Sequence, residues 1–163
     1  MSKLLTSAAL LASAQAAYMI GVDVSQPLSK ANWECLRKPG GQGPVEIGIV
    51  RMYQSVGRVD PNGAATIRNA IAAGVPYVHS YIFPCVKCGN PGKQVLDAVN
   101  AIKSSGIDLS SSNSSTTLWL DVERLSWYSN ASQNQAFIKG MVDEISKLPS
   151  GIKLGVYTNY YNW

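Results

Sequence analysis

The sequence predicts an α/β fold in which buried strands alternate with helices. Short apolar runs rich in Val, Ile, Leu and Tyr recur along the chain, at residues 19–24, 47–53, 77–83, 118–122 and 154–157. Runs of this length and composition are typical of buried strands. Helix-like apolar spacing fills the intervals, most clearly at 64–73, 93–104 and 133–147. This alternation favours a parallel sheet covered by helices, either closed into a barrel or left open.

Glycines follow the predicted helices as stop signals, at Gly74, Gly106 and Gly151. The resulting five strand–helix units are too few for a complete barrel, because an eight-stranded β/α barrel usually takes about 250 residues. A standard closed barrel therefore cannot be completed by these residues, and the spacing alone leaves a partial barrel and an open sheet as alternatives. Active sites of such folds lie at the C-terminal ends of the strands, where functional side chains are expected.

The N-terminus predicts export from the cell. Lys3 precedes an apolar run over residues 4–12, and the small-residue triplet at 14–16 resembles a signal-peptidase site. We therefore expect residues 1–16 to be a removed signal peptide and residues 17–163 to form one domain that is secreted or delivered to a lysosome or a gut lumen. No other run approaches the ~20 apolar residues of a membrane span, so no membrane partner is expected.

Composition and charge fit a globular exported domain. The chain has 46% apolar and 15% charged residues, and its formal net charge is +4. Basic residues are spread along the chain, so no nucleic-acid partner is expected. Glycosylation sequons at Asn113 and Asn130 lie in polar stretches that predict exposed loops.

Three cysteines, Cys35, Cys85 and Cys88, allow one internal disulfide at most. The sequence leaves open whether Cys85 pairs with Cys88 or one of them pairs with Cys35. A redox-active CxxC is disfavoured because Asn90-Pro91-Gly92 is expected to interrupt the helix that would lower its thiol pKa. Zinc bound by the CxxC pair and His79 would lack a fourth ligand.

Acidic side chains stand at two predicted strand ends. Side chains alternate between the faces of a strand, so the apolar Leu118, Leu120 and Val122 are expected to face the helices. Asp121 and Glu123 then lie together on the opposite face, and the same alternation places Asp23 of the first strand with them. Crowding of like charges is costly, which points to chemistry at this place.

Polar and aromatic residues are predicted to gather around these acids. By alternation, one pair of side chains on each of three further strands points to the same face as the acids. The pairs are Arg51 with Tyr53, His79 with Tyr81, and Tyr157 with Asn159. The strand ends therefore predict a polar site with aromatic walls.

The spacing of Asp121 and Glu123 suits glycoside hydrolysis. Same-face residues of a strand lie about 6.5–7 Å apart, which lets their carboxyl groups take the ~5–9 Å spans of that chemistry. Repulsion is expected to raise the pKa of one carboxyl, and Glu123, with the longer side chain, is the predicted general acid. A magnesium site is disfavoured because no phosphate-binding glycine loop or site lysine is evident, and no metal or cofactor is expected.

Five motifs in order resemble family 25 glycoside hydrolases: GVDVSQ at 21–26, VRMYQSVGRVDPNG at 50–63, YVHSYIFPC at 77–85, LWLDVE at 118–123 and GVYTNYYNW at 155–163. The resemblance is strongest to the invertebrate and protist branch, which includes nematode lysozymes. It implies a modified TIM-like β/α barrel that is irregular in its later strands and incomplete in this chain, with about five β/α units present and the last strands missing. It also implies hydrolysis of the β-1,4 bond after N-acetylmuramic acid in peptidoglycan. It also implies that the family continues past Trp163 with further strands and another acid.

By motif position the resemblance makes Glu123 the proton donor, Asp121 its acidic partner and Asp23 the acid that ends the first strand. The substrate-binding residues that we expect are Tyr81, Tyr157, Arg51, Tyr53 and Asn159. His79 stands where this branch usually carries an acid. The predicted protein is thus a monomeric secreted lysozyme that acts on bacterial peptidoglycan in defence or digestion. A catalytically impaired relative that binds cell wall or regulates is the alternative.

Overall fold

The structure is a computed structural model of the 163-residue chain. It describes residues 18–38, 44–106, 116–123, 127–148 and 152–161. The predicted signal peptide at 1–16, the sequon at Asn113 and the stop signal at Gly151 lie outside the described residues. The elements run in the order β1 (Ile20–Val24), α1 (Lys30–Leu36), β2 (Val45–Gln54), β3 (Arg58–Val59), α2 (Gly63–Ala72), β4 (Tyr77–Ile82), η1 (Val86–Cys88), α3 (Pro91–Ser104), β5 (Thr116–Asp121), α4 (Ala131–Ser146) and β6 (Ile152–Tyr157).

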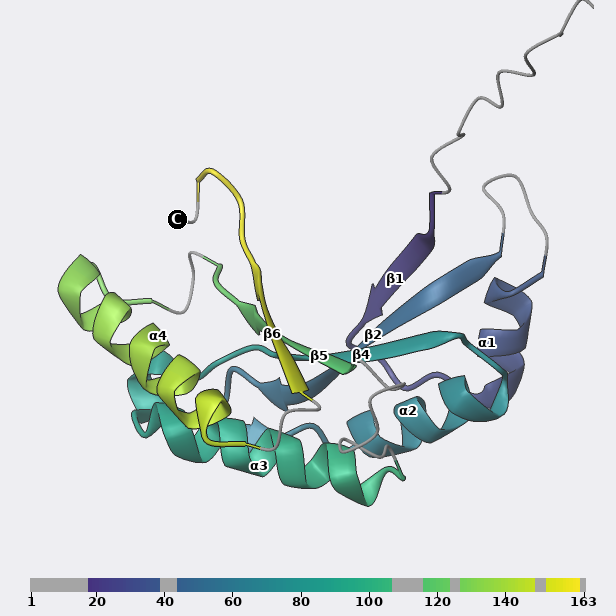
Figure 1. Ribbon diagram of the computed structural model, residues 1–163, viewed down its shortest axis with the longest axis horizontal. Helices are drawn as coiled ribbons and strands as arrows, with labels where there is room; N and C mark the ends of the chain where they lie inside the picture. Colours follow the sequence, from purple (N-terminus) through teal and green to yellow (C-terminus); the bar gives the residue numbers. More distant parts are fainter. Residues whose placement is uncertain (1–17, 39–43, 107–115, 124–126, 149–151, 162–163) are drawn as a thin grey trace, which may run out of the picture.

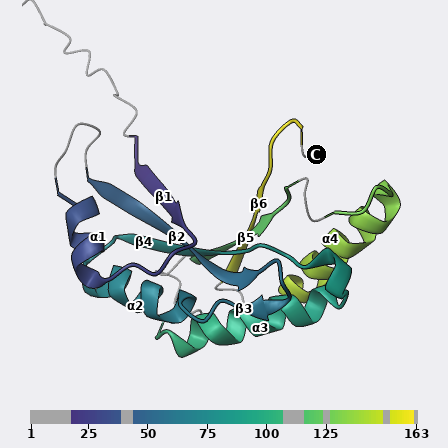
Figure 2. The ribbon, with the colours of Figure 1, turned by 180° about the vertical axis from the view of Figure 1, so that it is seen from behind.

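The strands form one mostly parallel sheet of six strands. Its order is β1-β2-β4-β5-β6, and the short β3 pairs antiparallel with β2. The sheet is curved, and the four α-helices lie along its outer side, while β1 and β6 are its two edges (Figure 1). The view from behind shows the same arrangement, with no helix of the described chain covering the inner face (Figure 2). The α/β class with a parallel sheet is therefore confirmed.

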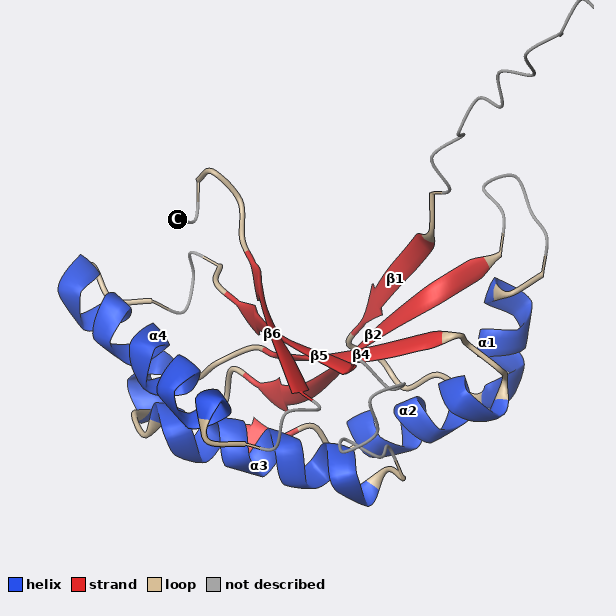
Figure 3. Cartoon of the chain, viewed as in Figure 1, coloured by secondary structure: helices blue, strands red, loops and turns tan. Residues whose placement is uncertain are grey.

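The predicted strands correspond to β1, β2, β4, β5 and β6, and the predicted helices correspond to α2, α3 and α4 (Figure 3). Gly74 and Gly106 follow α2 and α3 with positive φ values of 74° and 87°, so both stop signals are confirmed. None of the helices in the described part of the chain has the length and apolar character to cross a membrane.

Two helix starts differ from the sequence analysis. Helix α1 was not expected, and it begins with a capping box in which Ser29 accepts from the Asn32 N–H and Asn32 accepts from the Ser29 N–H. The predicted interruption after the CxxC pair is confirmed, because Gly89 and Asn90 separate η1 from α3, with Asn90 as the N-cap at φ 49°. Helix α3 then begins at Pro91, two residues before the expected start at 93, since a first-turn proline loses no hydrogen bond.

The core lies between the sheet and the helices. Leu118, Leu120 and Val122 of the β5 segment are at most 4% exposed, as their alternation predicted. Leu118 and Leu120 belong to one hydrophobic core with apolar residues of α3 and α4 such as Ile102 and Met141, which are fully buried. This packing anchors β5 from the helix side, because each buried aliphatic side chain contributes about 1.5–3 kcal/mol. The acidic face of the strand is left on the other side.

The disulfide joins Cys85 to Cys88, while Cys35 is exposed and unpaired. Of the pairings that the sequence left open, the local one is thus observed. The buried Gln94 of α3 also holds this loop, because it accepts from the Cys85 N–H and donates to the carbonyls of Cys85 and Gly89. The second sequon residue, Asn130, is exposed and caps α4 by accepting from the Gln133 N–H.

Candidate active site

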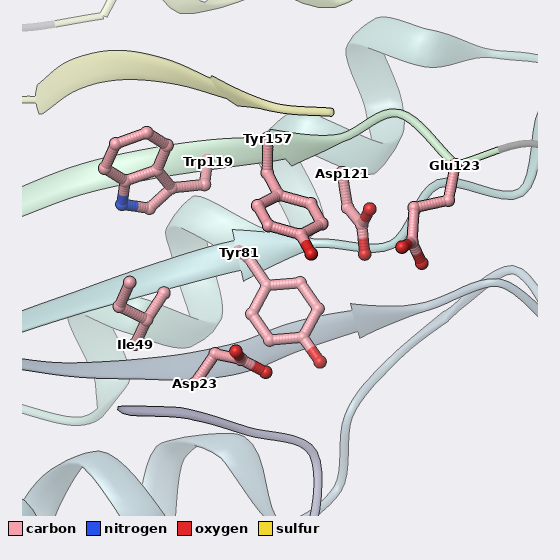
Figure 4. A pocket seen from close by; sticks show the side chains of 7 residues that line it. All are labelled: Asp23, Ile49, Tyr81, Trp119, Asp121, Glu123 and Tyr157. Carbon is pink, nitrogen blue, oxygen red and sulfur yellow. The ribbon is translucent and has the colours of Figure 1, made fainter. Parts of the chain in front are cut away.

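A pocket of about 310 Å³ opens on the inner face of the sheet, at the C-terminal ends of the strands. Its lining residues are Asp23, Ile49, Tyr81, Trp119, Asp121, Glu123 and Tyr157 (Figure 4). The three predicted acids and two of the five predicted substrate contacts therefore meet in one cavity. The volume is at the lower end of the range of small-ligand pockets.

Strand register explains why these side chains meet. Asp23 of β1 lies opposite Ile49 of β2, and Tyr81 of β4 lies opposite Trp119 of β5. Further along β5, Asp121 lies opposite Tyr157 of β6. Opposed residues of neighbouring strands point to the same face of a sheet, so the pairs form adjacent rows across the pocket.

Asp121 is the buried one of the three acids. It is 8% exposed, and its Oδ1 atom has no hydrogen-bond partner among the described residues. Burial raises the pKa of Asp121 to about 7, and the charges of Glu123 and Asp23 add to the effect. Figure 4 shows Asp121 and Glu123 side by side with their carboxyl groups pointing the same way.

The sequence predicted that repulsion would raise the pKa of one carboxyl of the pair. In the structure the pKa of Asp121 is raised, first because Asp121 is buried at the end of β5 and then because Glu123 and Asp23 lie near it. Burial, which the sequence did not predict for this carboxyl, is therefore the larger cause. The choice of Glu123 as the general acid stays a prediction.

Tyr81 stands among the charges of the site. Burial raises the pKa of its hydroxyl to about 12, with Arg51 opposing the shift and Asp23 and Asp121 among the charges that reinforce it. Tyr81 therefore keeps its proton at all ordinary pH values. It can donate a hydrogen bond to a ligand or to a carboxylate of the pocket.

Trp119 forms a wall that the sequence analysis did not assign to the site. Its Nε1–H donates to His79 Nδ1 at 3.3 Å, and the two rings are stacked with centroids 6.4 Å apart. A Cβ atom on Gly155 of β6 would lie 2.7 Å from two atoms of the indole, so the ring lies directly over this glycine. Burial, followed by the charge of Lys153, lowers the pKa of His79, which keeps Nδ1 free to accept.

Two signals could have found this wall. Trp119 shares the alternation of Asp121 and Glu123, and Gly155 provides space on the neighbouring strand. Ile49, the other lining residue that was missed, shares the alternation of Arg51. Nothing in an apolar side chain alone marks it as part of a polar site.

Arg51 does not line the pocket. Its Nε donates to Asp60 Oδ2 at 2.8 Å and its Nη2 donates to the Ser25 carbonyl at 2.9 Å. The guanidinium is therefore engaged by the protein itself rather than offered to a ligand.

Tyr53 and Asn159 also lie outside the pocket. The prediction that Tyr53 shares a face with Arg51 is wrong, because a register shift between them breaks the alternation of β2. Tyr53 is 3% exposed and belongs to the core. Asn159 is exposed, accepts from the Tyr161 N–H and lines a separate hollow beyond β6.

The residues of the site suit sugar chemistry better than metal binding. In the described parts of the chain, no group of three or more His, Cys, Asp or Glu side chains is placed to hold a metal ion. Two neighbouring carboxyl groups, one with a raised pKa, are the pair that glycoside hydrolysis requires. The fold and the site together define an α/β protein with paired carboxyl groups in a pocket at the strand ends, an arrangement that suits the chemistry of glycoside hydrolysis.

Comparison with known proteins identifies the family. The model of the family described as Lysozyme-like protein 1 matches residues 14–163. The chain belongs to this family of lysozyme-like proteins, as its motifs predicted.

The relatives carry lysozyme names. The chain is 39% identical to Lysozyme-like protein 5 of Caenorhabditis elegans, and 34% and 36% identical to Probable GH family 25 lysozymes 2 and 4 of Dictyostelium discoideum. Each match covers 88% of this chain and 62% of the relative, so the chain spans less than two thirds of their length. No solved structure matches the chain significantly.

Proposed function

We propose that the protein is a muramidase-type lysozyme that hydrolyses the β-1,4 bond between N-acetylmuramic acid and N-acetylglucosamine of bacterial peptidoglycan. The observation that carries the proposal is the pocket in which Asp121 and Glu123 lie side by side with Asp23 across from them. The lysozyme names of the relatives support the same substrate.

The proposed reaction uses one proton shared by the Asp121–Glu123 pair. One carboxyl group gives this proton to the glycosidic oxygen as the bond breaks, and the other, ionised, stabilises the positive charge that develops on the sugar. Water then bonds to the anomeric carbon, and its released proton returns to the carboxyl group that acted as the acid. Because Asp121 has a pKa of about 7, a large share of the free sites hold this proton at neutral pH, and more hold it at mildly acidic pH. The two carboxyl groups lie side by side, so the proton that Asp121 carries in the free site can pass to Glu123, which delivers it to the glycosidic oxygen.

The aromatic walls are proposed to bind the sugar. Tyr81, Trp119 and Tyr157 line the pocket and offer ring faces to the apolar sides of pyranose rings. The protonated Tyr81 hydroxyl donates to a sugar oxygen or to the ionised carboxylate, which fixes the reacting ring beside the acids.

Export and the larger architecture are parts of the same proposal. Residues 1–16 act as a signal peptide, and the Cys85–Cys88 disulfide agrees with an oxidising compartment. The curved sheet with its helices on the outer side supports a TIM-like barrel architecture (Figure 1). We propose a secreted monomer that acts on bacteria in defence or digestion.

Product analysis tests the proposal. Purified chain is incubated with peptidoglycan, the suspension is followed by turbidity, and the soluble fragments are reduced and identified by mass spectrometry. We expect clearing with N-acetylmuramic acid at the new reducing ends. New ends of N-acetylglucosamine would contradict the assigned bond, and chain that sediments with the wall but releases no fragments would favour the binding alternative.

A further inference from the structure

A buried carboxylate outside the pocket, Asp60, is held by three donors. Asp60 is 3% exposed and accepts from Arg51 Nε at 2.8 Å, from Gln54 Nε2 at 3.1 Å and from the Asn62 N–H at 3.0 Å. Burial alone would raise the pKa of this carboxyl, but the hydrogen bonds from Asn62, Arg51 and Gln54 lower it. Asp60 is therefore ionised in the folded protein at neutral pH.

The backbone around Asp60 is fixed as well. Its N–H donates to the Met52 carbonyl on β2, and its carbonyl accepts from the Gly63 N–H at the start of α2. These two bonds fix the backbone directly after β3, so the Asp60 carboxylate is held in one position beside Arg51.

Arg51 connects Asp60 to the strand that carries a pocket acid. While Nε binds Asp60, Nη2 binds the carbonyl of Ser25, which follows β1 and lies two residues after Asp23. Among the residues that the structure describes, Asp60 is the one carboxylate within ion-pair distance of Arg51. The charges of Arg51, Asp23 and Asp121 all act on the hydroxyl of Tyr81, so the guanidinium lies near the pocket without pairing with its acids.

We propose that Asp60 is a positioning residue for the active site. The Asp60 carboxylate holds the Arg51 guanidinium against the Ser25 carbonyl, and this contact fixes the end of β1, which carries Asp23. The same ion pair keeps the guanidinium from pairing with the pocket carboxylates. The consequence for catalysis rests on the proposed lysozyme function, whereas the effect on the pocket charges does not.

The variant Asp60→Asn separates this role from a purely structural one. Asparagine keeps an oxygen that accepts from the Asn62 N–H, but it removes the charge that holds Arg51. The matched control is Asp143→Asn, which removes the partner of Lys139 on the exposed side of α4. Thermal melts of the variants establish that they are folded.

The first measurement is a pH titration of Asp121. The NMR signal of its carboxyl carbon reports the titration, so no enzymatic activity is needed. In Asp60→Asn the released guanidinium turns toward the pocket, where Asp121 is faced by Asp23, Glu123, Tyr81 and Tyr157. We expect the apparent pKa of Asp121 to fall by about one unit, as it does for carboxyls that gain an arginine neighbour. Adding Arg51→Met removes the cation and abolishes this fall, and Asp143→Asn leaves the titration unchanged.

The second measurement is kinetic, on a soluble peptidoglycan fragment. We expect Asp60→Asn to lower kcat at least tenfold with little change of KM.

A second variant, Arg51→Lys, serves if Asp60→Asn does not fold. It retains the charge beside Asp60 but loses the hydrogen bond to the Ser25 carbonyl, and it is expected to lower kcat and shift the Asp23 carboxyl signal. An unchanged Asp121 titration in folded Asp60→Asn, or an unchanged kcat and Asp23 signal in Arg51→Lys, overturns the proposal. Absence of activity in the parent chain refutes the lysozyme function, while the titration still decides the role of Asp60.

Discussion

Trp119 donates its indole N–H to Nδ1 of His79, so a side chain of β4 sets the orientation of a pocket wall on β5. The bond requires neutral His79, and burial keeps the pKa of this histidine below its usual value of 6.5. Replacing His79 with Leu should release the indole and weaken sugar binding about three- to tenfold, the effect of one lost hydrogen bond. Fluorescence titration with a chitin oligosaccharide measures the affinity, and an unchanged Kd contradicts the assigned role.

The stability that the Trp119–His79 hydrogen bond contributes depends on pH. Because the folded pKa of His79 lies below the unfolded one, the unfolded chain binds the proton more readily, so this contribution to stability is present above about pH 6.5 and is lost as pH falls. Wild-type protein should therefore lose more stability than His79→Leu on going from pH 7 to pH 5. Urea unfolding at the two pH values measures the difference, and equal losses refute the prediction.

Gly155→Ala should displace the Trp119 wall, because the new methyl group meets the indole ring. We expect a loss of about 1–3 kcal/mol of unfolding free energy, typical of overpacking. In a Trp119→Leu background, Gly155→Ala should cost much less unfolding free energy, because the obstructing ring is gone. If Gly155→Ala costs the same in both backgrounds, the prediction is contradicted.

Asp121→Asn should stabilise the protein at alkaline pH. The folded pKa of Asp121 is about 7 against a usual value of 3.8, so the folded state binds the proton more readily and stability is lost as pH rises between these values. The neutral amide avoids this loss, and we expect the variant to be more stable by about 2 kcal/mol at pH 8 after allowance for screening. Unfolding at pH 4 and pH 8 tests the sign, and a variant less stable than wild type at pH 8 contradicts it.

The two tyrosines that were predicted as substrate contacts should now behave differently. Tyr81→Phe removes a hydroxyl from the pocket and should raise KM or lower kcat about tenfold. Tyr53→Phe changes a core residue and should leave both constants unchanged while altering stability. Steady-state kinetics of the two variants show which tyrosine contacts the substrate. A large kinetic effect of Tyr53→Phe would mean that Tyr53 belongs to the site after all.

The sequence predicted most of the fold because apolar runs and stop signals are local features. The five long strands and three of the helices were found from such features, whereas α1 was missed because its seven residues bury little besides Trp33. The start of α3 was placed at residue 93 instead of Pro91, because a proline that breaks a helix interior also suits a helix start and spacing alone does not separate the two cases.

Alternation predicted the acids of the site and failed where the strand itself is irregular. Asp121 and Glu123 continue a regular β5, so their shared face followed from their spacing. The register shift in β2 turned Tyr53 into the core, and no sequence feature marked it. The raised pKa of Asp121 depends first on burial, which only the folded arrangement supplies, and then on the charges of Glu123 on the same segment and Asp23 on another strand.

The central claim is that the Asp121–Glu123 pair performs acid catalysis on a glycosidic bond. Its most direct test is the initial rate of release of reducing ends from peptidoglycan by wild type, Glu123→Gln and the surface control Asp143→Asn at pH 6, each shown to be folded. We expect Glu123→Gln to be at least a hundredfold slower, since loss of a general acid costs about 10²–10⁴ in rate, and the control to match wild type. A Glu123→Gln rate equal to that of wild type would contradict the account.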